Sequence, residues 1–193
     1  MSLSLLSCAG GLNDEDAART ALLNESLDVC RRGLVAAGEN ASLYSTLGRT
    51  QYELRQLEES LQAYETAVGL EPDHVWSALY NAHCLHDLER WAEAVVAYEA
   101  VDISSFDGPK SWRGVLLRDQ LAICRLHAGD VERSITDFEA ALHRYESNPG
   151  LLHSPQYLVE AANATPGDRL KIRVDALLRK EGWPSRADQS AQS

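Results

Sequence analysis

The chain has 193 residues, which at about 150 residues per domain fits one compact domain or one short array of repeats. Hydrophobic residues make up 45% and charged residues 24%, which suits a globular protein better than a disordered, collagen-like or membrane-spanning one. Ala and Leu are abundant and β-branched residues are sparse, so the composition favours helices over a β sandwich or barrel. The net charge of -11 disfavours nucleic acid and anionic membrane surfaces as partners.

The four cysteines, Cys8, Cys30, Cys84 and Cys124, show no CxxC spacing. Their number and placement are typical of reduced thiols, so a cytoplasmic location is expected. Leu5-Leu6-Ser7-Cys8 resembles the cleavage site of bacterial lipoproteins, but no basic residue precedes it and its apolar stretch is shorter than a signal sequence requires. Export is therefore not expected, and no run approaches the ~20 apolar residues of a membrane span.

An internal repeat organises the middle of the chain. Placing residues 41–73 over 75–107, at an offset of 34 residues, aligns Ser60 with Ala94 and Tyr64 with Tyr98. A further step of 40 residues aligns the same two positions with Ser134 and Phe138. Large and small residues thus recur in the same order three times, which indicates a repeat architecture.

Apolar spacing predicts a run of helices. Residues 14–37 form either one long helix or a short pair, and three pairs follow at 41–54 with 57–70, 75–88 with 91–102, and about 110–128 with 131–146. Only Arg55-Gln56 lies between the two helices of the first pair, so these helices are expected to be antiparallel neighbours. Pro72 ends the second helix and Asp73 is the expected cap of the next. Two shorter helices are predicted at 155–163 and 168–181.

The first repeat resembles the tetratricopeptide repeat family, through the spacing of Tyr44, Leu47-Gly48, Tyr52, Leu57, Ser60, Tyr64, Ala67 and Pro72. The second resembles it through Ala82, Leu88, Trp91, Ala94, Tyr98 and Val101, and the third through Leu121-Ala122, Gly129, Ser134, Phe138 and Ala141. The resemblance covers residues 41 to 146. It implies an all-α fold, an antiparallel helix-pair solenoid that winds as a right-handed superhelix with helical N- and C-terminal caps.

This resemblance divides the chain into six segments. Residues 1–40 form an N-terminal helical segment that reads as a degenerate repeat, and 41–74 form the first repeat. Residues 75–108 form the second, with an insertion that extends to 114, and 115–149 form the third. Residues 150–184 are expected to be capping helices, with Leu170, Val174, Leu177 and Leu178 laid on the last repeat, and 185–193 a disordered tail. The alternative for the helix at 168–181 is that it docks on a partner.

No sequence motif points to catalysis. The chain contains no Gly-rich phosphate loop, GxSxG elbow or HExxH sequence. His83, His86 and Asp87 have a spacing that could hold a metal, but without a fourth ligand nearby they are more typical of polar groove residues. Cys84 and Cys124 occupy equivalent repeat positions, which indicates small packing residues. We therefore expect no catalytic residue, no metal site, no cofactor and no enzyme activity.

The tetratricopeptide resemblance implies a concave groove, lined by the first helix of each pair, that takes an extended peptide or an amphipathic helix of another protein. The positions that match this groove are Ser45, Arg49, Tyr52, Trp76, Leu79, His83, His86, Asp119, Ile123 and His127. Trp76 and Tyr52 are the strongest anchors among them, because exposed aromatics are favoured at interfaces. The expected function is that of a non-catalytic scaffold or adaptor.

Two related roles compete with this one. Co-chaperones of the family that grip an acidic C-terminal peptide use a clamp of two Lys, two Asn and one Arg. Only Arg49 supplies a cation at the matching positions Ser45, Arg49, Tyr80, Leu116 and Gln120, so that role is disfavoured. A small secretion chaperone, similar to the three-repeat acidic chaperones of type III export, agrees in size, acidity and repeat number and remains the alternative.

Overall fold

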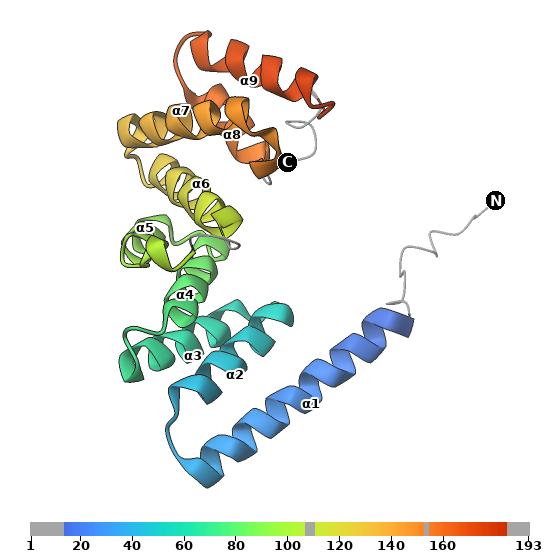
Figure 1. Ribbon diagram of the computed structural model, residues 1–193. Coiled ribbons are helices and arrows are strands. Elements are labelled where there is room, and N and C mark those ends of the chain that lie inside the picture. Colours follow the sequence, from blue (N-terminus) through green and yellow to red (C-terminus); the bar gives the residue numbers. More distant parts are fainter. Residues whose placement is uncertain (1–13, 107–110, 153–154, 185–193) are drawn as a thin grey trace, which may run out of the picture. The chain divides into compact units, whose positions relative to one another are not determined.

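A computed structural model describes residues 14–106, 111–152 and 155–184 of the chain, and within them every regular element is a helix. Its α-helices are α1 Asp14–Ala37, α2 Ala41–Glu53, α3 Leu57–Leu70, α4 Val75–Asp87, α5 Trp91–Glu99, α6 Ser111–His127, α7 Val131–Ser147, α8 Pro155–Ala164 and α9 Arg169–Lys180 (Figure 1). Two short 3-10 helices, η1 Ile103–Phe106 and η3 Pro149–Leu151, lie between them. The predicted all-α class and paired helices are confirmed.

The predicted helices coincide with the observed ones to within about two residues at most ends. Residues 14–37 form one helix, which resolves the alternative of a short pair. The second helix of the second pair stops at Glu99, three residues earlier than expected. The insertion after it forms η1, whose Phe106 is buried, and the following helix α6 has 17 residues against 13 in α2 and α4. The tail at 185–193 lies outside the described residues, as does Cys8.

The chain divides into two compact units with a boundary between Tyr80 and Asn81. In the first unit, α1 runs antiparallel to α2 (Figure 1). The pairing is visible in two contacts: Arg19 Nη2 donates to Glu53 Oε2 over 3.0 Å, and the hydroxyls of Ser26 and Thr50 lie 3.2 Å apart. Leu27 and Cys30 are the buried apolar residues of α1.

Small residues let α2 and α3 approach closely. Ser60 is fully buried and its Oγ donates to the backbone carbonyl of Gly48 over 2.7 Å. A Cβ atom on Gly48 would lie 3.0 Å from the ring of Tyr64, which is tighter than ordinary van der Waals contact. Glycine at this position therefore leaves the Tyr64 ring the space that a methyl group would occupy.

The second unit repeats this crossing between α6 and α7, where Ser134 Oγ donates to the carbonyl of Ala122 over 2.8 Å. Ala122, Ser134 and Phe138 are all at most 1% exposed. In the pair between these two, Ala82, Ala94 and Tyr98 occupy the matching positions and are fully buried. Large rings and small residues thus pack in the order that the sequence alignment predicts.

The three helix pairs turn in the same way. The second residue after the first helix has a left-handed backbone at Arg55 (φ 61°), Glu89 (φ 57°) and Gly129 (φ 92°). The next residue in each case donates its N–H to a carbonyl five positions earlier: Gln56 to Gln51, Arg90 to Leu85 and Asp130 to Arg125, each over 2.9 Å. This is the Schellman pattern, which closes a helix and reverses the chain within two residues.

The C-terminal helices close the second unit. α9 packs against α7 and α8, and Leu170, Val174, Leu177 and Leu178 are each at most 3% exposed (Figure 1). Arg173 makes two hydrogen bonds to Glu146 on α7, of 3.0 and 2.8 Å. The apolar stripe therefore packs within the chain, as expected of a capping helix.

One predicted helix cap differs from the structure. The sequence suggested Asp73 as the cap of α4, but the imidazole of His74 accepts the N–H of Ser77 over 3.1 Å. Its Nδ1 also lies 2.7 Å from the Ser77 hydroxyl. A neutral imidazole can satisfy the free N–H groups of a first turn in the same way as a carboxylate, so the start of the helix does not require an acidic side chain.

Candidate partner-binding surface

One face of α2 remains available after the helix has packed on α1 and α3. Ser45, Arg49 and Tyr52 share this face by helical periodicity, with Arg49 exposed and the other two half-buried. The opposite side of the helix is occupied by Thr50, which contacts α1. The three positions predicted for the first repeat therefore keep side-chain surface for a partner.

Tyr52 belongs to a stack of three tyrosines in the first unit. The ring of Tyr80 lies parallel to that of Tyr64 at 5.6 Å and meets the edge of Tyr52 at 5.9 Å. Offset and edge-on ring pairs of this kind fix side-chain orientation. Trp76 is half-buried on α4, whereas Leu79 is only 2% exposed, so Leu79 offers a partner almost no surface.

His83 is held in its neutral form. Its Nδ1 shares a 2.7 Å hydrogen bond with the hydroxyl of the buried Tyr98. Burial, together with the smaller effect of the nearby His86, lowers the pKa of His83 to about 4. The imidazole therefore acts at neutral pH as an uncharged hydrogen-bonding group.

His86 and His127 lie in an aromatic cluster to which four helices contribute. His86 meets the rings of Trp91 at 5.5 Å and Tyr157 at 6.0 Å, and the Trp91 ring stacks on His127 at 4.4 Å. Each histidine also pairs with a carboxylate: His86 Nδ1 with Asp87 Oδ1 at 2.9 Å, and His127 Nε2 with Glu160 Oε1 at 2.8 Å. His127 retains exposed surface, and the cluster links α8 to the helices before it.

The two remaining groove positions of α6 are buried. Ile123 is 2% and Asp119 4% exposed. Asp119 accepts a hydrogen bond from the Tyr145 hydroxyl and lies 4.0 Å from Arg144. Burial raises the pKa of Asp119 to about 6, although the Tyr145 hydrogen bond opposes the rise. Both residues therefore serve packing between helices more than contact with a partner.

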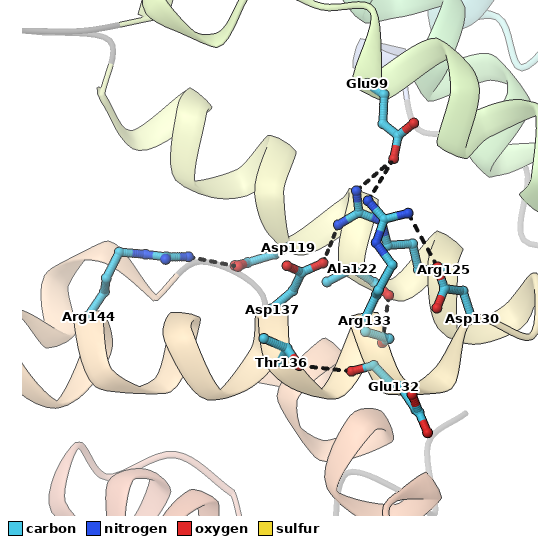
Figure 2. A network of polar contacts seen from close by, with 11 residues as sticks. Glu99, Asp119, Ala122, Arg125, Asp130, Glu132, Arg133, Thr136, Asp137 and Arg144 are labelled. Atoms are coloured by element: carbon cyan, nitrogen blue, oxygen red, sulfur yellow. Dashed lines mark hydrogen bonds and ion pairs between the residues drawn. The ribbon is translucent and has the colours of Figure 1, made fainter.

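Beside Asp119, a network of ion pairs ties three helices together (Figure 2). Arg125 on α6 is 8% exposed and bridges Glu99 of α5, at 2.7 Å, and Asp137 of α7. Arg133 also reaches Glu99 at 3.5 Å. Burial alone would lower the pKa of Arg125, but the hydrogen bonds to the two carboxylates outweigh it and raise that pKa. The guanidinium therefore stays charged and holds the α5–α6–α7 packing.

Within residues 14–106, 111–152 and 155–184, no group of three or more His, Cys, Asp or Glu side chains is placed to hold a metal ion. Cys84 and Cys124 are fully buried, as expected for packing residues. Burial raises the pKa of the Cys124 thiol to about 12, so it remains protonated. In the same part of the chain, no helix combines the length and apolarity needed to cross a bilayer.

Sequence patterns did not predict that Trp91 and Tyr157 belong to the aromatic cluster, or that Glu160 pairs with its His127. Trp91 aligns with Leu57, and this match predicts only a repeat position. Tyr157 lies 71 residues after His86, and its hydroxyl is 3.3 Å from Nε2 of that histidine. Helical periodicity places residues on a face but does not report which distant helix meets that face, so only aromatic residues at unusual positions could have hinted at the cluster.

Comparison with known proteins agrees with the repeat pattern. The tetratricopeptide repeat family matches residues 45–107. DnaJ homolog subfamily C member 7 of Mus musculus is 39% identical over 62 residues, and the Cell division cycle protein 16 homolog of Homo sapiens is 31% identical over 78 residues. These matches cover 32% and 40% of this chain but only 13% of each relative. The similarity is therefore confined to the repeats, and it carries no information about the functions of the whole relatives.

Solved structures share the fold at low sequence identity. MamA from Desulfovibrio magneticus RS-1 superposes with a TM-score of 0.63 at 12% identity, over 87% of this chain and 86% of that one. Nearly identical TPR-like repeats from Podosopora anserina give 0.64 at 17% identity, over 84% and 90%. Tetratricopeptide repeats as a class are protein–protein interaction modules and are typically non-catalytic. Residues 45–107 therefore match the tetratricopeptide repeat family, and the described helix pairs share the fold of TPR-like repeat structures.

Proposed function

We propose that this protein is a non-catalytic adaptor that binds a peptide or an amphipathic helix of another protein through the first helices of its pairs. The observation that carries the proposal is the side of α2 on which Arg49 is exposed and Ser45 and Tyr52 are half-buried. Trp76 and His127 add half-buried and exposed ring surface on α4 and α6. Aromatic and arginine side chains are the residues most enriched at binding hot spots.

The distribution of charge supports the same surface. The second helices, α3, α5 and α7, carry nine acidic and two basic residues, whereas the first helices, α2, α4 and α6, carry three acidic and four basic ones. The net negative charge of the chain therefore resides mainly on the second helices. A partner segment on the first helices would meet a nearly neutral surface with aromatic anchors, so it need not be strongly basic.

The experiment is a binding comparison between variants of the full chain. Partners recovered by affinity purification are titrated against wild type, a Trp76→Ala/Arg49→Glu variant, and the charge-reversal control Glu65→Arg on the exposed side of α3. Loss of at least tenfold in affinity, about 1.4 kcal/mol, is expected for the first variant and little change for the control. Equal affinity of both variants would refute a site on the first helices, and melting curves ensure that each variant is folded.

A further inference from the structure

A recess in the first unit lies on a different side of α2 from Ser45, Arg49 and Tyr52. Its volume is about 250 Å³. It is lined by Tyr44, Leu47 and Gln51 of α2 and by Glu59, Gln62, Ala63 and Thr66 of α3. This volume is below the ~300–1,000 Å³ of pockets for drug-sized ligands, so the recess suits one side chain better than a whole small molecule.

Gln51 provides a polar group that the fold leaves unsatisfied. The residue is 7% exposed, and its side-chain oxygen Oε1 accepts no hydrogen bond from the part of the chain that the structure describes. A buried amide oxygen without a donor costs free energy, and most such groups in folded proteins have a partner. Rotation about the last torsion of a glutamine is soft, so this oxygen can turn toward a donor that enters the recess.

The charge and walls of the recess specify what kind of donor fits. The exposed Glu59 is one of its lining residues, and α3 carries three glutamates and no basic residue. Tyr44, Leu47 and Ala63 supply apolar walls. A ligand that fits both the apolar walls and the Gln51 and Glu59 oxygens must combine an alkyl stem with a cationic head that has several N–H donors. Arginine has these features: three methylenes and a planar guanidinium with five donors.

We propose that this recess binds an arginine side chain presented by a protein partner. The guanidinium donates to Gln51 Oε1 and to the Glu59 carboxylate, and the methylenes pack against Tyr44 and Leu47. A lysine ammonium is a compact point charge and is less suited to bridging two separated acceptors. The recess is lined by other residues than the proposed partner surface at Ser45, Arg49 and Tyr52. An experiment can therefore disprove one of the two sites without disproving the other.

Ordinary structural roles could also explain these residues. A glutamate in the first turn of a helix stabilises its positive end, and Glu58 shares that position with Glu59. Glu58 is also exposed but is not among the residues that line the recess, which makes it a matched control.

The first test is an NMR titration of the ¹⁵N-labelled full chain with N-acetyl-arginine amide, which mimics an arginine within a polypeptide. We expect saturable shifts of the Gln51 side-chain amide and of the Ala63 and Thr66 backbone amides. N-acetyl-norleucine amide, which has an alkyl stem and no charge, should leave these signals in place. Equal shifts with the norleucine probe, or no saturable shift with the arginine probe, would overturn the proposal. Tighter binding of free arginine would identify an amino-acid site instead and would also overturn it.

The second test compares Glu59→Gln, Gln51→Leu and Glu58→Gln. Loss of a surface ion pair should weaken the arginine probe about two- to fivefold in Glu59→Gln, with no loss in Glu58→Gln. Gln51→Leu should abolish the saturable shift without lowering the melting temperature, because it removes an unsatisfied buried group. Equal weakening by the two glutamate variants, or unchanged binding in Gln51→Leu, would show that general acidity and not this recess attracts the probe.

Discussion

The hydroxyl of Ser60 on α3 donates a 2.7 Å hydrogen bond to the backbone carbonyl of Gly48 on α2. Ser134 makes the same bond to Ala122, also twelve residues away, between α6 and α7. The serine therefore does more than provide small volume, since it also gives a helix carbonyl a second hydrogen bond. The middle pair has Ala94 and Ala82 at these positions and has no hydroxyl to donate.

Removing the hydroxyl should be measurable at both crossings. Ser60→Ala and Ser134→Ala are each expected to lower the free energy of unfolding by about 0.5–1.5 kcal/mol, the net value of a buried hydrogen bond. Ala94→Ser should cost less, because the new hydroxyl can reach the carbonyl of Ala82. Urea denaturation of the three variants measures this. A cost for Ala94→Ser as large as that of the other two would argue against equivalent crossings.

Enlarging the same position tests the close approach itself. Ser60→Leu should destabilise the protein by about 1–3 kcal/mol, because the added volume forces α2 and α3 apart. Glu58→Leu, on the exposed side of the same helix, should change the melting temperature little. Identical melting temperatures for the two variants would contradict the repeat alignment.

The left-handed residue of each turn offers a stabilising change. Glu89 has φ 57°, a conformation that costs an L-residue roughly 1–2 kcal/mol and that glycine adopts freely. Glu89→Gly should therefore raise the free energy of unfolding by about 0.5–1 kcal/mol. Glu89→Ala removes the same side chain without relieving the backbone and serves as the control. The difference between the two variants in urea isolates the backbone effect, and no difference would refute it.

His83 should make the protein sensitive to acid. Its pKa is about 4 in the folded chain, against an ordinary value of 6.5. Because the unfolded chain takes up this proton first, the stability that His83 contributes is present above pH 6.5 and is lost as the pH falls toward 4. His83→Asn, whose side-chain oxygen can still bond to Tyr98, should lose less stability over that range. Urea midpoints at pH 7 and pH 4.5 test this, and parallel losses in both proteins would contradict it.

Asp119 should have the opposite dependence. Its pKa is raised to about 6 from an ordinary 3.8, so the folded chain holds this proton more tightly than the unfolded one. Its contribution to stability is therefore present below about pH 4 and is lost as the pH rises through 6. Asp119→Asn should thus gain stability relative to wild type between pH 4.5 and pH 7.5. A relative loss over that interval would mean that the hydrogen bond from Tyr145 to the ionised carboxylate dominates.

Two variants separate the apolar and ionic parts of the α9 cap. Leu178 is 1% exposed, so Leu178→Ala should cost about 2–5 kcal/mol. Arg173→Ala removes two hydrogen bonds to the exposed Glu146 and should cost at most about 1 kcal/mol. Thermal melting of the two proteins gives the ranking. A larger loss for Arg173→Ala would show that the cap is held chiefly by charge.

Much of the fold could be predicted because its signals are local. Helical spacing, Pro72 and the two-residue turns at Arg55 and Gly129 predict most helix ends to within about two residues. The groove positions were less predictable. Leu79, Asp119 and Ile123 match the expected face but are at most 4% exposed, because their burial depends on which neighbouring helix lies over them. Tyr157 and His86 lie 71 residues apart in the sequence, so their contact also depends on how distant helices pack together.

The three identical turns also determine where the chain can change in length. Each helix pair closes through a hydrogen bond from the second turn residue to a carbonyl five positions back, so one added residue inside a turn would break that bond. The extra residues of this sequence stand instead between α5 and α6, where η1 forms and Phe106 is buried. Evolution or design can therefore alter the spacing between successive pairs without opening any of them. Such changes would adjust the positions of the anchor side chains along a bound segment and leave each pair intact.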